Sequence, residues 1–260
     1  MRATLAAACA ALWAVGCHPR TPPPDLSLDP AALLSQLAAA QAMVRTVQGE
    51  ARVRYRSPRG SATVRQFAAA ERPDRVHIEE LDFFGNPAAV LVTGGGSFSF
   101  YDARQKVLYQ GAATPRNLER LVPLPFSAPD LVAILLGGAP LVPQAGGEAR
   151  ADPEDGAVRL RLPQGDVSEE VWVGAGARAL RASRQVAGGA GPGSWEATFS
   201  AFRERAGAPF PGVVAIRSPP AHVEVELTWT EVEVNGELDP GLFRLEPPRG
   251  ARVEEVGEGP

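Results

Sequence analysis

The chain has 260 residues, 45% of them hydrophobic, and its formal net charge at pH 7 is -4. This mild acidity argues against nucleic-acid binding and against electrostatic binding to a membrane surface. The only two cysteines, Cys9 and Cys17, lie close to the N-terminus, so a domain that follows them must be stable without disulfides. The length and hydrophobic content are sufficient for one large domain with its own core.

The first predicted element is a signal peptide over residues 1–16. Arg2 precedes an apolar and small-residue run from Ala3 to Gly16, which is too short to span a bilayer. Residues 14–17, Ala-Val-Gly-Cys, resemble the lipobox of bacterial lipoproteins, although alanine stands where leucine is usual. The resemblance implies that Cys17 is lipidated and becomes the new N-terminus, while Cys9 is removed. The alternative is an ordinary secretory signal, which leaves Cys17 as a free thiol or removes it.

Residues 17–28 form a predicted Pro-rich spacer that separates the lipidated cysteine from the domain. Asp29 and Pro30 then begin a helix, as N-cap and first helical residue. We expect this helix to end at Gly49. Its predicted core-facing residues are Leu33, Leu37, Ala40, Val44 and Val47.

From Glu50 onward, apolar and polar residues alternate, which predicts antiparallel strands joined by short turns. We expect about eleven strands in one sheet. His77 alternates with apolar neighbours, so it is expected on the polar face in a structural role. A phase shift in the last long strand predicts a bulge at Thr230-Glu231. The domain is predicted to cover residues 29–250, followed by a disordered tail over residues 251–260.

Two predicted helices interrupt the strands. Thr114-Pro115 begins the first, and Ser127 with Asp130 forms a capping-box pattern at the start of the second. The second helix is apolar all round, which indicates burial. We expect it to pack on the sheet through Leu131, Ile134 and Leu135. The predicted fold class is therefore mainly β with α cover: a single antiparallel half-barrel closed by an N-terminal helix and a central helix pair.

Patterns typical of catalysis or metal binding are scarce. There are three histidines, and the cysteines and histidines show no metal-ligand spacing. Serines beside glycines do not match G-x-S-x-G. The acidic pairs Glu79-Glu80 and Glu169-Glu170 are adjacent, so their members face opposite sides of a strand. We therefore expect no enzyme activity, no cofactor and no metal site.

A sheet of this width has an inner face that its own side chains do not fill, which predicts an apolar cavity beneath the helices. The alternative is that sheet and helices pack shut. The residues expected to line the cavity are Phe67, Phe98, Phe100, Tyr109, Leu118, Leu121, Phe126 and Trp195.

The strand–loop–strand over residues 71–93, the helix pair over residues 117–140 and the strands after residue 195 carry a family resemblance. They resemble the outer-membrane lipoprotein receptor of the lipoprotein-sorting pathway and related bacterial lipoproteins, with a LolA/LolB-like fold. The resemblance implies a lipid-anchored, periplasm-facing protein of the outer membrane. Such a protein binds lipoprotein acyl chains in its cavity and helps to place them in the outer membrane. The implied partners are an acylated lipoprotein or lipid, the outer membrane and a periplasmic lipoprotein carrier.

The loop over residues 81–87 contains two phenylalanines beside turn-forming residues. By resemblance, Phe84 occupies the position of a protruding apolar residue before glycine, which implies insertion into the membrane surface. Phe83 is then expected to be its inward partner, and the alternative is that both rings fold into the core. A function of another class also remains open. It is a structural or regulatory envelope lipoprotein with a closed core that acts through protein contacts.

Overall fold

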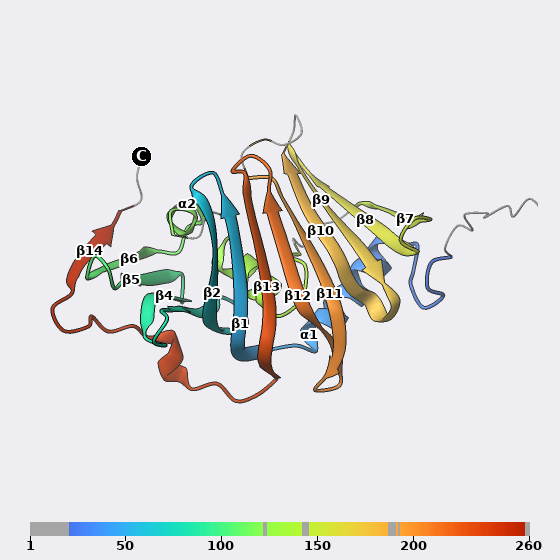
Figure 1. Ribbon diagram of the computed structural model, residues 1–260. Helices are drawn as coiled ribbons and strands as arrows, with labels where there is room; N and C mark the ends of the chain where they lie inside the picture. Colours follow the sequence, from blue (N-terminus) through green and yellow to red (C-terminus); the bar gives the residue numbers. More distant parts are fainter. Residues whose placement is uncertain (1–20, 122–123, 142–145, 187–190, 192, 258–260) are drawn as a thin grey trace, which may run out of the picture.

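The computed structural model describes residues 21–121, 124–141, 146–186, 191 and 193–257. The predicted signal peptide and Cys17 lie outside these residues. The described chain forms one sheet of fourteen strands with helices on its inner face (Figure 1). Within this part of the chain, no helix combines the length and the apolar character needed to cross a membrane.

The helical elements are α1 (Pro30–Ala42), α2 (Pro115–Glu119) and α3 (Ala128–Leu135), with 3-10 turns η1 (Ala175–Ala177) and η2 (Pro240–Phe243). The strands before α2 are β1 (Thr46–Ser57), β2 (Gly60–Glu71), β3 (Arg75–Leu81), β4 (Pro87–Gly94), β5 (Ser97–Asp102) and β6 (Val107–Ala112). The strands after α3 are β7 (Glu148–Asp152), β8 (Ala157–Gln164), β9 (Val167–Gly174), β10 (Arg178–Val186), β11 (Trp195–Arg205), β12 (Ala208–Ser218), β13 (Val223–Val234) and β14 (Arg252–Val256).

The strands lie in the order β14-β6-β5-β4-β3-β2-β1-β13-β12-β11-β10-β9-β8-β7. The central pair joins β1 to β13, which are far apart in the sequence. Glu50 pairs with Glu231 and Ala51 pairs with Trp229, so Thr230 is the extra residue of a bulge. The predicted bulge is confirmed. It also explains Gly49, because a Cβ there would collide with the carbonyl oxygen of Glu231.

The N-terminal helix begins as predicted and ends earlier. The Asp29 carboxylate accepts a hydrogen bond from the backbone N–H of Ala32 at 2.8 Å, which caps α1. The helix ends at Ala42, so the predicted end at Gly49 is wrong. Val47 belongs to β1, where it pairs with Val234 on β13. The long-range β1–β13 ladder takes up backbone hydrogen bonds that the sequence pattern assigned to a helix.

The end of the predicted spacer packs against the domain. The backbone N–H of Gly176 donates to the Asp25 carboxylate at 3.0 Å. The Gln36 side chain donates to the Asp25 carbonyl and accepts from the Ser27 N–H, both at 3.0 Å. The chain therefore joins the domain beside α1 and η1, and the free part of any tether ends before Asp25.

The central helix pair forms as predicted. Thr114 caps α2, and Ser127 and Asp130 form the expected capping box at the start of α3. α3 packs on β2 and β3, while α1 packs on β7, β8 and β10. The apolar side chains of α3 are buried, including the three expected to face the sheet, Leu131, Ile134 and Leu135. The sheet thus bends around two separate helical covers (Figure 1).

The sheet has more strands than the eleven or so that the sequence predicted. β7 is a short edge strand that carries charged residues. β14 lies in the segment expected to be disordered, and it pairs in parallel with β6. β14, with the sequence RVEEV, lacks the alternating apolar pattern of a half-buried strand, and β7 has only alanines at its alternating apolar positions. Each strand pairs with a single neighbour, β14 with β6 and β7 with β8.

The C-terminal segment covers part of the outer face of the sheet. After β13 it passes the lower ends of the strands to η2, which packs on β3 and β4, and then continues to β14 (Figure 1). His77 lies on the outer face, as predicted, but it is only 6% exposed. Its Nδ1 lies 2.5 Å from the carbonyl oxygen of Leu242, and its Nε2 lies 2.9 Å from a carboxylate oxygen of Glu79. His77 thus joins β3 to the C-terminal segment, in a structural role.

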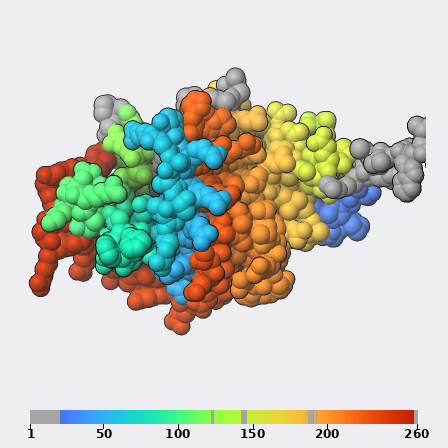
Figure 2. Space-filling model, in the orientation of Figure 1, coloured from blue at the N-terminus to red at the C-terminus, as the bar shows by residue number. Residues whose placement is uncertain are grey.

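The rest of the outer face around β1 and β13 is charged. Arg54 pairs with Glu226 at 3.0 Å and Arg56 with Glu224 at 2.6 Å, across neighbouring strands. Figure 2 shows this face, with β1 in cyan beside β13 in orange-red. Exposed pairs of this kind contribute little to stability, about 0–1 kcal/mol each. This part of the outer face is therefore a solvated surface, whereas the apolar cavity lies on the inner face.

Candidate functional site

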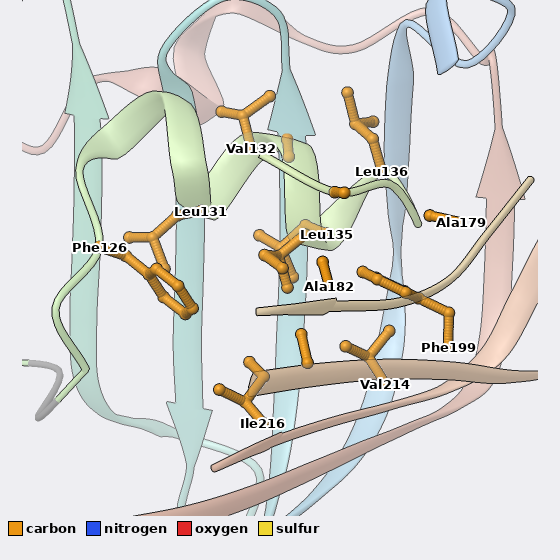
Figure 3. Packing of buried hydrophobic residues seen from close by; sticks show 14 of the residues in the cluster. Phe126, Leu131, Val132, Leu135, Leu136, Ala179, Ala182, Phe199, Val214 and Ile216 are labelled. Atoms are coloured by element: carbon orange, nitrogen blue, oxygen red, sulfur yellow. The ribbon is translucent and has the colours of Figure 1, made fainter. Parts of the chain in front are cut away.

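The inner face contains a cavity of about 180 Å³ between the sheet and α3. Alternate residues of seven strands reach it, because successive strand residues point to opposite faces. Figure 3 shows Leu131 and Leu135 of α3 beside Val214 and Ile216 of β12, and all four line the cavity. The lining residues are Val53, Tyr55, Gln66, Ile78, Glu80, Ala89, Leu91, Phe100, Leu121, Leu124, Leu131, Ile134, Leu135, Val214, Ile216, Val225, Leu227 and Trp229.

Three polar side chains from adjacent strands interrupt this apolar lining. Gln66 on β2 pairs with Glu80 on β3, and its amide Nε2 donates a hydrogen bond to the hydroxyl of Tyr55 on β1. Burial raises the pKa of Tyr55 to about 12; the hydrogen bond from Gln66 opposes this shift and the charge of Glu80 adds to it. The Tyr55 phenol is therefore neutral at physiological pH.

The cavity leads to the surface beside the β1–β2 hairpin. An outer hollow of about 410 Å³ shares Tyr55, Glu80 and Leu121 with the cavity. Its remaining lining residues are Ser57, Arg59, Gly60, Ser61 and Ala62, all from the hairpin. Glu80 is one residue from the end of β3, so it lies at the rim between the apolar cavity and the hollow. The combined space is amphipathic, with an apolar interior and a polar entrance.

Of the eight residues that were expected to line a cavity, two line the cavity that the structure contains. Phe100 and Leu121 line it. Tyr109 stacks on Phe100 with ring centroids 6.4 Å apart, and Phe98 and Leu118 are buried in the core. Phe126 and Trp195 pack edge to face at 5.1 Å and are also buried in the core.

The expectation for Phe67 is wrong. Gln66 faces the cavity, so its neighbour Phe67 points to the outer face, where its ring contacts His77 at a centroid distance of 5.8 Å. Phe67 therefore belongs to the layer beneath the C-terminal segment. Its face is decided by the register of β2 against its neighbouring strands, which the sequence alone does not give.

Sequence reasoning missed the polar residues of the cavity. One signal was available for Glu80: it follows Ile78 by two residues in a predicted strand, so both side chains face the same side of β3. Gln66 had no such signal, since its place depends on the register of β2 against β1 and β3. Among the residues that the structure describes, no cluster of three or more His, Cys, Asp or Glu side chains is placed to hold a metal ion.

The loop between β3 and β4 presents an exposed aromatic pair. Phe83 is 95% exposed and Phe84 is 85% exposed, with ring centroids 5.5 Å apart. The expectation that Phe83 points inward is therefore wrong. The reason is the turn itself: Asp82 accepts hydrogen bonds from the N–H groups of Phe84 and Asn86, both at 2.8 Å. These bonds, that from Asn86 first, lower the pKa of Asp82 and hold both rings outside the sheet.

Comparison with known proteins identifies the architecture. No family model matches the chain, and no curated protein matches it. A domain assigned to outer membrane lipoprotein sorting from Vibrio parahaemolyticus is 12% identical, with 81% of this chain and 95% of that chain covered and a TM-score of 0.57. A LolA superfamily protein from Nitrosomonas europaea is 11% identical, with coverages of 84% and 99% and a TM-score of 0.56. The chain has a LolA/LolB-like fold.

A third solved structure extends this result. A DUF1329 family protein from Desulfovibrio piger is 10% identical, with 84% of this chain and 98% of that chain covered and a TM-score of 0.58. The three structural matches thus cover 81–84% of this chain and 95–99% of the solved chains. The resemblance found in the sequence is confirmed for the fold.

The raised pKa of Tyr55 gives a pH-dependent prediction. Because folding raises this pKa from 10.0 to about 12, the resulting stability is present below pH 10 and is lost as the pH rises toward 12. Wild-type protein should lose unfolding free energy across this window more steeply than Tyr55→Phe. At neutral pH, Tyr55→Phe should cost about 1 kcal/mol, because the buried Gln66 amide loses its acceptor. Chemical denaturation at several pH values measures both effects.

A tyrosinate absorbance titration provides the control. The protein contains three tyrosines, so one of the three should ionise late in the wild type and be missing from the Tyr55→Phe titration. Ionisation of all three together near pH 10 would contradict the buried environment of Tyr55.

Proposed function

We propose that this protein is a lipid-anchored protein that faces the periplasm, binds lipoprotein acyl chains in the cavity beneath α3 and helps to place them in the outer membrane. The apolar cavity on the inner face of a LolA/LolB-like sheet carries this proposal. The proposed partners are an acylated lipoprotein or lipid, the outer membrane and a periplasmic lipoprotein carrier. Transfer of this kind forms and breaks no covalent bond, so the proposed role is not that of an enzyme.

Cavity size sets a condition on this role. A cavity of roughly 150 Å³ holds a molecule the size of benzene, whereas ligand pockets usually span about 300–1,000 Å³. At about 180 Å³, the present cavity is too small for a long acyl chain. We therefore propose that α3 moves away from the sheet when cargo enters. Such a movement exchanges one set of apolar contacts for another, which keeps its net cost small.

The same small volume favours a second candidate function. If α3 stays in place, the inner face is a closed core, and the protein acts as a structural or regulatory envelope lipoprotein through protein contacts. The two candidates differ in whether the cavity accepts an acyl chain.

A cavity-filling substitution tests this choice. Ala89 lines the cavity, and Ala89→Phe places a ring where the acyl chain is expected. We expect acyl chains to co-purify with the full-length Cys17→Ser protein and to be reduced at least about tenfold by Ala89→Phe, as measured by mass spectrometry. Ala88→Phe is the matched control, because the neighbouring Ala88 does not line the cavity. Absence of any acyl chain from the parent protein would contradict lipid handling and support the closed core.

The anchor is proposed at Cys17. Metabolic labelling with a palmitate analogue should label the wild-type protein and leave Cys17→Ser unlabelled. The mature chain should lack Cys9. A wild-type protein without label would refute the lipid anchor and leave the secretory alternative.

We propose that the exposed loop contacts the membrane. The described chain begins beside α1 at the β7–β10 end of the sheet, whereas the loop follows β3 near the other end. The loop begins two residues after Glu80, so Phe83 and Phe84 lie beside the cavity entrance. Burying one phenylalanine in the bilayer surface contributes about 1.5–3 kcal/mol, which is enough to orient a protein that is already tethered.

Charge substitutions in the loop test this contact. Phe84→Glu and Phe83→Glu should each leave the thermal midpoint unchanged, because both side chains are exposed. Each should lower binding to phospholipid vesicles about tenfold and slow acyl delivery to them, since a carboxylate replaces an inserting ring. Val253→Glu, which changes an exposed apolar residue on β14, is the control and should bind like the wild type. Wild-type binding by both loop variants would refute membrane insertion.

A further inference from the structure

The polar rim of the cavity indicates which kind of head group a ligand carries. This inference rests on the proposed function. Glu80 is partly buried and lines both the apolar cavity and the outer hollow. An acyl chain that fills the cavity from this entrance leaves its head group at the rim. The carboxylate of Glu80 is therefore a neighbour of the head group.

The negative charge of Glu80 is not neutralised locally. Within the described part of the chain, Glu80 forms no hydrogen bond or ion pair, whereas Glu79 on the opposite face bonds to His77. The other two polar groups of the cavity, Tyr55 and Gln66, bond to each other.

Arg59 is the other charged residue that lines the cavity or its outer hollow. It lies at the hairpin tip, beyond Gly60, and Gln66, the partner of Glu80, is six positions after Gly60 along β2. At about 3.3 Å per residue its backbone is roughly 20 Å farther out. This exceeds the screening length of about 8 Å in physiological salt, so Arg59 does not cancel the charge at the rim.

We propose that the cavity selects acyl ligands whose head group donates N–H hydrogen bonds and carries no negative charge, as an N-acylated amine or a lipidated peptide does. Glu80 accepts from the head group, and its carboxylate repels a carboxylate or phosphate placed at the same rim. The apolar lining recognises the chain, and Glu80 discriminates among head groups. Free fatty acids and anionic phospholipids are thereby excluded from a site that would otherwise accept their chains.

Competition among matched amphiphiles tests this selection. The full-length Cys17→Ser protein is loaded with a neutral apolar fluorescent dye, and dodecylamine, dodecanamide and dodecanoate displace it below their micelle concentrations. We expect the amine and the amide to compete at least about tenfold better than the carboxylate. Glu80→Gln should remove most of this difference by improving dodecanoate binding. Glu79→Gln removes the same charge from the opposite face and should keep the wild-type preference.

Each outcome separates the head-group inference from the proposed function. If all three amphiphiles compete equally, or if Glu80→Gln leaves their order unchanged, the head-group selection is overturned while acyl binding stands. Stronger competition by dodecanoate overturns it as well. If none of the amphiphiles displaces the dye, acyl binding itself fails, and the inference fails with it.

Discussion

The apolar inner face of the sheet is the constraint on which the rest of this structure depends. An open sheet this wide presents one continuous apolar surface, and a curved sheet cannot cover that surface with its own side chains. Two helices from different parts of the chain supply the cover: α1 over β7–β10 and α3 over β2 and β3. Because α3 is only eight residues long, its cover is incomplete, and a cavity remains beneath it.

The two faces of the sheet are covered in different ways. On the outer face around β1 and β13, charged residues alternate with inward apolar ones and pair across strands, so water can cover them. Around β3 and β4 the outer face carries buried residues such as Val90, Val92 and His77. There the C-terminal segment forms a second layer, held by the contact between His77 and the Leu242 carbonyl. This layer covers neither the inner face nor the β3–β4 loop.

The arrangement concentrates the candidate functional groups at one end of β3. Glu80, which lines the cavity entrance, and the exposed pair Phe83 and Phe84 lie within five residues of chain. The turn organised by Asp82 holds both aromatic rings exposed, outside the lining of the cavity and of its outer hollow. A ligand that leaves the cavity at this entrance would thus emerge beside the most exposed apolar side chains of the sheet.

The sequence by itself determined the features that depend on neighbouring residues. The starts of α1 and α3, the burial of α3, the alternation of most strands and the bulge at Thr230 follow from capping chemistry and periodicity, which act over a few residues. Tertiary structure decided what depends on pairing between distant segments. The β1–β13 ladder ended α1 early, the register of β2 placed Gln66 inside and Phe67 outside, and the C-terminal segment buried His77. The volume of the cavity was likewise set by how closely α3 approaches the sheet, because packing distance depends on all the contacting side chains together.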